Sequence, residues 1–133
     1  MEQQDESWLN GEELNIDWIE WHGSSISPLP DGCAVRAITR CGNDLTRQSE
    51  TFRWTHQDRP GDIVKFRIIE PELMRWCEWE SSWNDGKSPV PRDYVVEIKF
   101  RDGGDTHTCL AGKLYWGDCE ESSIVEYQIV EVP

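Results

Sequence analysis

The sequence predicts an all-β fold in which two small antiparallel four-stranded units, copies of each other, pack together. Three observations support this prediction. Blocks of sequence recur in the same order, apolar and polar residues alternate within the blocks, and turn-forming residues separate them. The first block is DWIEW, residues 17–21, which returns as RWCEW, residues 75–79. In both blocks two tryptophans bracket two residues, and the second of these is glutamate.

Three further blocks recur at nearly the same offset, which drifts only from 58 to 62 residues. PLPDGCAVRAITRCGN (28–43) aligns with PVPRDYVVEIKFRDGG (89–104), FRW (52–54) with LYW (114–116), and IVKFRIIE (63–70) with IVEYQIVE (124–131). Four blocks in one order at one offset indicate an internal duplication. We therefore divide the chain into a short acidic N-terminal segment at 1–13, a first β repeat at 14–71 and a second β repeat at 72–133.

Each block has the residue pattern of a strand. Apolar and polar side chains alternate along residues 94–101 and 124–129, and again along 64–68, as they do in half-buried strands. The sequence predicts strands at 16–21, 33–40, 51–55 and 62–70, and at 75–80, 93–101, 112–117 and 123–131. The connection at 70–76 contains no long flexible run, so we expect the two units to pack together.

The tryptophan pairs constrain the packing. Side chains alternate between the two faces of a strand, so Trp18 and Trp21 point to opposite faces, as do Trp76 and Trp79. One tryptophan of each pair therefore lies outside its own repeat's core. We expect that tryptophan to lie against the sister repeat; the alternative is a partner molecule.

Composition narrows the class of protein. There are 26 acidic and 13 basic residues, giving a net charge of −13, which disfavours direct binding to nucleic acid or to an anionic membrane and favours a basic protein surface. The sequence contains no apolar run long enough to span a membrane, and its N-terminus lacks a secretion signal. Five cysteines without close pairing predict free thiols and an intracellular location.

The order of these motifs resembles a tryptophan-rich repeat of small, mostly uncharacterised proteins of tailed bacteriophages. The matching positions are Trp18, Ile19, Trp21, Gly23, Pro28, Pro30, Trp54, residues 61–68 and Arg101-Asp102-Gly103. The first repeat departs from the pattern at residues 40–42, and the second departs at Cys77 and at 119–123. The resemblance implies a phage origin, small β repeats and the host cytoplasm as location, and it implies no catalytic residues.

The residues suggest no enzyme and no cofactor. The three histidines, His22, His56 and His107, have no histidine at the sister positions, and no nucleophile, phosphate-loop or zinc-protease motif is present. His107, Cys109 and Cys119 lie close in sequence, but a structural zinc site needs four ligands and a fourth is not evident. We therefore predict no catalytic residue and no metal.

The charge is uneven between the repeats: residues 1–12 carry −4, residues 13–71 carry −2 and residues 72–133 carry −7. The second repeat therefore offers an acidic face for a basic partner, although acidic residues also serve solubility. The candidate contacts, with Trp83 as an apolar anchor, are Glu78, Glu80, Trp83, Asp102, Asp105, Asp118, Glu120 and Glu121.

These observations predict a non-enzymatic acidic phage protein that binds and inhibits a host protein, for example a nucleic-acid-handling defence complex in the manner of an anti-CRISPR or anti-restriction protein. Two alternatives remain. Paired repeats also suit a pocket for a nucleotide or a sugar, with Trp21 and Trp79 stacking on the ligand. A structural accessory role in the virion is the other alternative. The sequence does not predict an oligomeric state.

Overall fold

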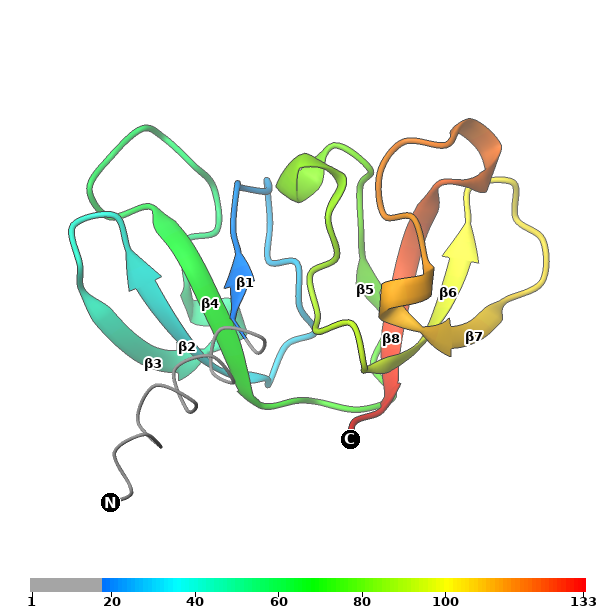
Figure 1. Cartoon of the computed structure of the whole chain (residues 1–133), viewed down its shortest axis with the longest axis horizontal. Coiled ribbons are helices and arrows are strands. Elements are labelled where there is room, and N and C mark those ends of the chain that lie inside the picture. Colours follow the sequence, from blue (N-terminus) through cyan, green and yellow to red (C-terminus); the bar gives the residue numbers. More distant parts are fainter. Residues whose placement is uncertain (1–17) are drawn as a thin grey trace, which may run out of the picture.

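The computed structural model describes residues 18–133 and contains two four-stranded antiparallel sheets, one from each repeat (Figure 1). The strand order is β1-β4-β2-β3 in the first sheet and β5-β8-β6-β7 in the second, so equivalent strands occupy equivalent places. The predicted all-β duplication is confirmed, whereas the segment at 1–13 lies outside the described residues. The strands are β1 Ile19–Glu20, β2 Ala34–Thr39, β3 Asp44–Gln48, β4 Ile63–Glu70, β5 Cys77–Glu78, β6 Val95–Phe100, β7 His107–Leu110 and β8 Ile124–Glu131.

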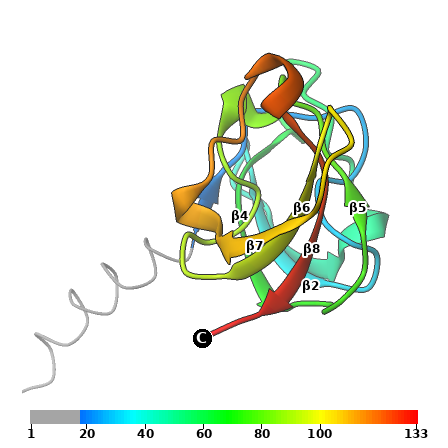
Figure 2. The same ribbon diagram turned by 90° about the vertical axis from the view of Figure 1, so that its right-hand side faces the viewer.

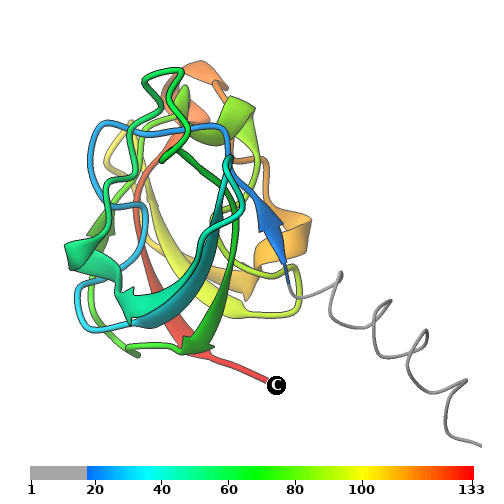
Figure 3. The ribbon, with the colours of Figure 1, turned by 90° about the vertical axis from the view of Figure 1, so that its left-hand side faces the viewer.

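Short 3-10 helices complete the fold: η1 Ser49–Thr51, η2 Trp83–Gly86, η3 Ala111–Lys113 and η4 Glu120–Ser122. The two sheets lie side by side, and the linker between β4 and β5 crosses below them in Figure 1. Seen along the long axis from either side, strands and loops form a ring around an interior (Figures 2 and 3). One cluster of buried apolar side chains contains residues of both repeats.

Tryptophans organise the core of the first repeat. The Trp21 indole N–H donates to the Trp54 carbonyl (3.0 Å), and the Trp54 indole N–H donates to the Ser49 carbonyl (2.8 Å). The two rings meet edge to face, and both pack edge to face on Phe66 of β4. Each indole thus fills the apolar interior while its polar N–H satisfies a buried loop carbonyl, as a buried tryptophan requires.

The second repeat reproduces this arrangement. The Trp79 indole N–H donates to the Trp116 carbonyl (2.9 Å), and the Trp116 indole N–H donates to the Ala111 carbonyl (3.1 Å). Trp116 packs edge to face on Trp79 and on Tyr127, which occupies the place of Phe66. The recurrence of the same pair of side-chain bonds supports the duplication.

The third strand of each repeat lies elsewhere than the sequence predicts. The structure has β3 at Asp44–Gln48 rather than at 51–55, and β7 at His107–Leu110 rather than at 112–117. Both strands are sheet edges and mostly exposed, so they lack the apolar alternation that predicts a strand. The apolar runs FRW and LYW instead follow a 3-10 turn and send their tryptophans into the core through the indole bonds.

The tryptophan pairs divide as strand geometry requires, but the expected role of the outer member was wrong. Trp21 and Trp79 lie in the cores of their own repeats, 2% and 1% exposed. Trp18 lies on the outer face of its own sheet, with Lys65 of β4 over its ring at 5.1 Å from the centroid, rather than against the sister repeat. Trp76 is covered in the same way by Lys99 of β6, at 4.3 Å.

The two repeats are joined by polar contacts as well as by the shared core. The Asn84 side-chain oxygen accepts from the His22 backbone N–H (2.7 Å), and the Asn84 N–H donates to the Gly23 carbonyl (3.1 Å). The Tyr127 hydroxyl donates to the Pro28 carbonyl from the other repeat. Asn84 belongs to a stretch in which the second repeat is three residues longer than the first, between the aligned blocks, so the insertion serves the contact between repeats.

A buried carboxylate holds the loop before β4. Asp62 is fully buried and accepts hydrogen bonds from the Gln57 N–H (3.0 Å), the Arg59 N–H (3.1 Å) and the Arg53 guanidinium (3.0 Å). Burial by itself raises the pKa of this carboxyl, but these hydrogen bonds to the charged form outweigh burial and lower the pKa to about 2. In the second repeat Ser123 occupies this place and accepts the Cys119 N–H (2.6 Å).

The different positions of the paired tryptophans predict different energetic roles. Trp21→Phe removes buried volume and the bond to the Trp54 carbonyl, so we expect the free energy of unfolding to fall by about 2 kcal/mol. Trp18→Phe keeps an aromatic ring on an outer face, and we expect the free energy of unfolding to fall by less than about 1 kcal/mol. Urea unfolding followed by circular dichroism measures both; equal losses would contradict the assignment of core and outer face.

The Asp62 network predicts an acid-sensitive contribution to stability. Because the folded pKa of about 2 lies below the ordinary value of 3.8, this contribution is complete above pH 4 and is lost as pH falls towards 2. We expect Asp62→Asn to be less stable at pH 7 and to lose less stability between pH 4 and pH 2. Urea unfolding across this range tests it, with exposed Asp93→Asn as control; parallel pH profiles for wild type and Asp62→Asn would disprove it.

Candidate acidic binding site

One end of the second repeat gathers negative charge. It consists of three segments, which we call the acidic end: 80–86 and 117–122 lie at the upper edge of Figure 1, and 101–105 begins the loop on the right-hand side, after β6. They hold seven acidic residues and one basic residue, Arg101. The acidic residues, all exposed, are Glu80, Asp85, Asp102, Asp105, Asp118, Glu120 and Glu121.

Backbone contacts hold the three segments together. The Asp102 N–H donates to the Glu121 carbonyl (3.0 Å), and the Arg101 N–H donates to the Ser123 carbonyl (2.8 Å), which joins the β6–β7 turn to the segment before β8. Gly86, at the end of η2, lies close to Gly117: a Cβ on Gly86 would lie only 3.0 Å from the Gly117 Cα. The carboxylates therefore project from a supported surface rather than from separate loops.

Asp118 has a structural role within the acidic end. One of its side-chain oxygens accepts the Glu120 N–H and the Ser123 hydroxyl, both at 3.2 Å, and lies 3.8 Å from the Arg101 guanidinium. Glu120 itself has a left-handed backbone conformation, with φ of +54°. Neutralising Asp118 would therefore disturb the turn as well as the charge, and the other carboxylates are better probes of binding.

The structure brings together most of the predicted contacts but not all of them. Glu80, Asp102, Asp105, Asp118, Glu120 and Glu121 belong to the acidic end. Glu78 lies apart on β5, where it faces a pocket between the repeats. Trp83 is only 4% exposed and packs edge to face on Trp79 in the core, so its ring has no open surface for a partner and leaves the set of contacts.

The equivalent end of the first repeat is electrically balanced. Its three segments, at 22–27, 40–44 and 55–61, hold two acidic and two basic residues. Arg40 pairs there with Asp58 (3.2 Å) and with buried Asp62 (3.5 Å). The first repeat forms a sheet with the same strand order and a balanced end, so the strand arrangement does not require the excess of carboxylates on the second repeat.

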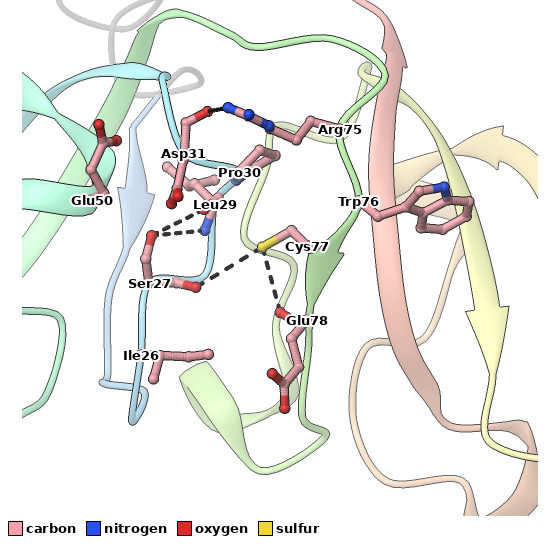
Figure 4. Close-up of a pocket in the computed structure, with 10 residues that line it drawn as sticks. All are labelled: Ile26, Ser27, Leu29, Pro30, Asp31, Glu50, Arg75, Trp76, Cys77 and Glu78. Carbon is pink, nitrogen blue, oxygen red and sulfur yellow. Dashed lines mark hydrogen bonds between the residues drawn. The ribbon is translucent and has the colours of Figure 1, made fainter.

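A pocket of about 470 Å³ lies between the repeats. Figure 4 shows the segment 26–31 of the first repeat on one side and β5 with its preceding residues on the other. Arg75 donates across it to the Asp31 carbonyl (3.1 Å), and Ile26 is 50% exposed at its rim. The complete lining is Ile26, Ser27, Leu29, Pro30, Asp31, Glu50, Arg75, Trp76, Cys77 and Glu78.

The cysteine in this pocket is not an activated nucleophile. Burial raises the pKa of the Cys77 thiol to about 12, and burial likewise raises the pKa of the neighbouring Cys33 thiol to about 11. Both side chains therefore stay protonated near neutral pH, when only the thiolate reacts readily. The chemistry that the pocket offers is polar and apolar contact with a ligand.

The tryptophans proposed to stack on a ligand do not line this pocket. Trp21 and Trp79 are buried in their own cores, with their indole N–H groups bonded to loop carbonyls. Trp76, the outer member of the second pair, borders the pocket, but its ring points away from the other lining residues in Figure 4, towards the sheet that carries Lys99. The sequence pattern separates the members of a pair onto opposite faces, but it does not tell which face is buried.

Sequence reasoning missed several charged residues of these two surfaces. Asp85 belongs to the acidic end and lies 3.4 Å from His22 of the first repeat. Asp31 and Glu50 come from the first repeat, whose small net charge hides them, and they reach the pocket only through the packing of the repeats. The Asn-Asp-Gly run at 84–86 signals a turn, which is the one hint that Asp85 is exposed.

Within residues 18–133, no group of three or more histidine, cysteine, aspartate and glutamate side chains is arranged to hold a metal ion. None of the helices in this part of the chain has the length and apolar character needed to cross a membrane.

Comparison with protein-family models finds no match for this sequence, and neither curated proteins nor solved structures match it significantly. The resemblance to tryptophan-rich phage repeats thus stays a prediction. The function has to be inferred from the distribution of charge and from the pocket.

Proposed function

We propose that this protein is a non-enzymatic binding protein whose acidic end engages a basic surface of a host protein and inhibits it. The observation that carries the proposal is the contrast between equivalent ends of the two repeats. The equivalent segments 22–27, 40–44 and 55–61 of the first repeat hold two carboxylates and two guanidinium groups, and those of the second hold seven carboxylates and one guanidinium group. A balanced end is compatible with this fold, so selection for folding alone does not account for the excess.

The geometry of the acidic end suits a basic protein surface. Its carboxylates are exposed, hydrogen bonds join the β6–β7 turn to the segment before β8, and Gly86 lies against Gly117, so the carboxylates offer an array to lysine and arginine side chains. Such an array accelerates encounter with a complementary surface and weakens with salt. A host enzyme that handles nucleic acid carries the matching basic groove, and in this proposal the acidic end takes the place of phosphates in the host cytoplasm.

Neutralising the acidic end provides the test. A variant with amides at Glu80, Asp102, Asp105, Glu120 and Glu121 keeps Asp118 and its turn. The matched control has the same number of amides at exposed carboxylates elsewhere, at Asp58, Glu70, Glu72, Asp93 and Glu131. We expect wild type and control to capture one basic protein from a bacterial lysate at low salt and to release it at high salt.

In the same experiment we expect the acidic-end variant not to capture that partner, because it lacks the carboxylates that pair with the partner's lysine and arginine side chains. Quantitative mass spectrometry of the captured proteins measures the difference. Equal capture by the acidic-end variant and the control variant would refute the proposal. Recovery of the protein from purified phage particles would instead favour the structural accessory role.

A second candidate function is binding of a small ligand, and the pocket between the repeats favours it. Its volume of about 470 Å³ lies in the range of small-molecule sites. It combines apolar side chains such as Leu29 with the charged groups of Asp31 and Arg75. In this candidate the charged and apolar groups make the contacts, because Trp21 and Trp79 are buried and the Trp76 ring points away from the pocket (Figure 4).

Tryptophan fluorescence titration tests the pocket with panels of nucleotides and sugars. If one of them binds there, we expect saturable quenching in wild type, with binding at least tenfold weaker in Arg75→Gln. Lys113→Gln, a neutral change on an exposed residue of the second repeat, serves as the control. Saturable quenching that all variants share would place the ligand elsewhere.

A further inference from the structure

An exposed tyrosine stands beside the acidic end. Tyr115 is 65% exposed, more than any other large hydrophobic side chain among residues 18–133. It lies in the chain between the 3-10 helix η3 and the segment 117–122 of the acidic end. Tyrosine is enriched among the residues that dominate binding energy at protein interfaces, because its ring combines apolar area with a hydroxyl group. Such exposure indicates a binding surface where the fold gives the ring no structural task.

The sister position in the first repeat does have a structural task. By the repeat alignment Arg53 is the counterpart of Tyr115, and its guanidinium donates to buried Asp62 (3.0 Å) and to the Thr55 carbonyl (2.9 Å). In the second repeat Ser123 takes the place of Asp62, so no buried carboxylate at this place needs a cation. The position of Tyr115 is therefore released from the task that Arg53 performs.

Close contacts hold the Tyr115 ring against the acidic end. A Cβ on Gly117 would lie 2.9 Å from the Tyr115 hydroxyl oxygen and 3.0 Å from the ring carbon that bears it, so the ring lies directly on this glycine. Gly117 is buried, and Gly86 of η2 also approaches it closely. Asp118 and Asp85 adjoin these two glycines in the chain. The ring thus rests on backbone that carries two carboxylates of the acidic end.

The charge around the ring is negative even when the flanking lysines, Lys87 and Lys113, are counted. The segments 80–87, 101–105 and 113–122 contain seven acidic and three basic residues, a net charge of −4. An exposed aromatic ring attracts a cation to its face, and surrounding carboxylates add to this attraction. The ring and the charge therefore favour the same kind of ligand, a cationic side chain.

We propose that Tyr115 and the acidic end together bind an arginine side chain of the partner, in a site that favours arginine over lysine. We call it the arginine site; it rests on the proposed function, in which the acidic end engages a basic protein surface. A guanidinium plane stacks on an aromatic ring while its N–H groups bond to a carboxylate, whereas an ammonium group is compact and strongly hydrated. Tyr115 takes the role that the sequence suggested for Trp83, whose ring is in the core.

Two peptides of equal charge, hexa-arginine and hexalysine, separate the effect of the ring from that of charge. Fluorescence anisotropy of the labelled peptides at low salt gives a Kd for each, and the ratio of the hexalysine Kd to the hexa-arginine Kd measures the preference for arginine. Tyr115→Leu removes the ring and no charge, and Tyr115→Phe keeps the ring. The control, Trp18→Leu, removes a ring from the outer face of the first sheet. Thermal unfolding checks that each variant folds.

We expect wild type, Tyr115→Phe and Trp18→Leu to share one preference for hexa-arginine. In Tyr115→Leu the ratio is expected to fall by about threefold, the size of an exposed cation–π contact, while hexalysine still binds because the carboxylates remain. Gly117→Ala is expected to lower the ratio as well, since its Cβ displaces the Tyr115 ring. The variant with amides at the acidic end is expected to bind both peptides more weakly than wild type.

A Tyr115→Leu variant with the wild-type ratio would overturn the arginine site and leave the proposed function standing. Equal Kd values of wild type for the two peptides would also overturn it, as would the absence of binding to either peptide. Undiminished binding of both peptides by the acidic-end variant would place the cation elsewhere and count against the site too. Failure of the proposed function has a different sign, which is equal capture from the lysate by the acidic-end variant and its matched control.

Discussion

The hydrogen bonds from tryptophan indoles to loop carbonyls are the interaction on which the rest of this structure depends. Each repeat has only about 60 residues, a size at which a single core is marginal. A buried indole contributes a large apolar surface, and its bond to a loop carbonyl satisfies the N–H that burial would otherwise leave without a partner. In the first repeat the Trp21 indole donates to the Trp54 carbonyl, and the Trp54 indole donates to the Ser49 carbonyl.

Because the indole hydrogen bonds support the core of each repeat, the end loops and the outer faces of the sheets can differ between the repeats. Since the indole bonds and the strand order are the same in both repeats, the loops at the ends and the outer faces of the sheets carry differences that the fold tolerates. One copy carries the acidic end, and the other carries Lys65, Arg36 and Arg67 around Trp18. A duplicated scaffold thus places opposite charges on separate faces of one small molecule, where salt screens them from each other.

The contact between the repeats depends on residues that do not repeat. Asn84 lies in the longer stretch of the second repeat and bonds to His22 and Gly23 of the first. Tyr127, at the place of Phe66, adds a hydroxyl that reaches the Pro28 carbonyl. Both interactions come from residues of the second repeat that the first repeat lacks, so the contact between the repeats is asymmetric.

The sequence by itself determined the duplication, the all-β class and the opposite orientation of paired tryptophans, because these follow from repeat offset and from alternation along a strand. It did not determine β3 and β7, since exposed edge strands lack apolar alternation and the neighbouring FRW and LYW runs mimic it. Only the tertiary structure decided that Trp21 rather than Trp18 is buried and that Trp83 belongs to the core. It also decided which charges meet, because Lys65, Arg36 and Arg67 converge on Trp18 only through strand pairing.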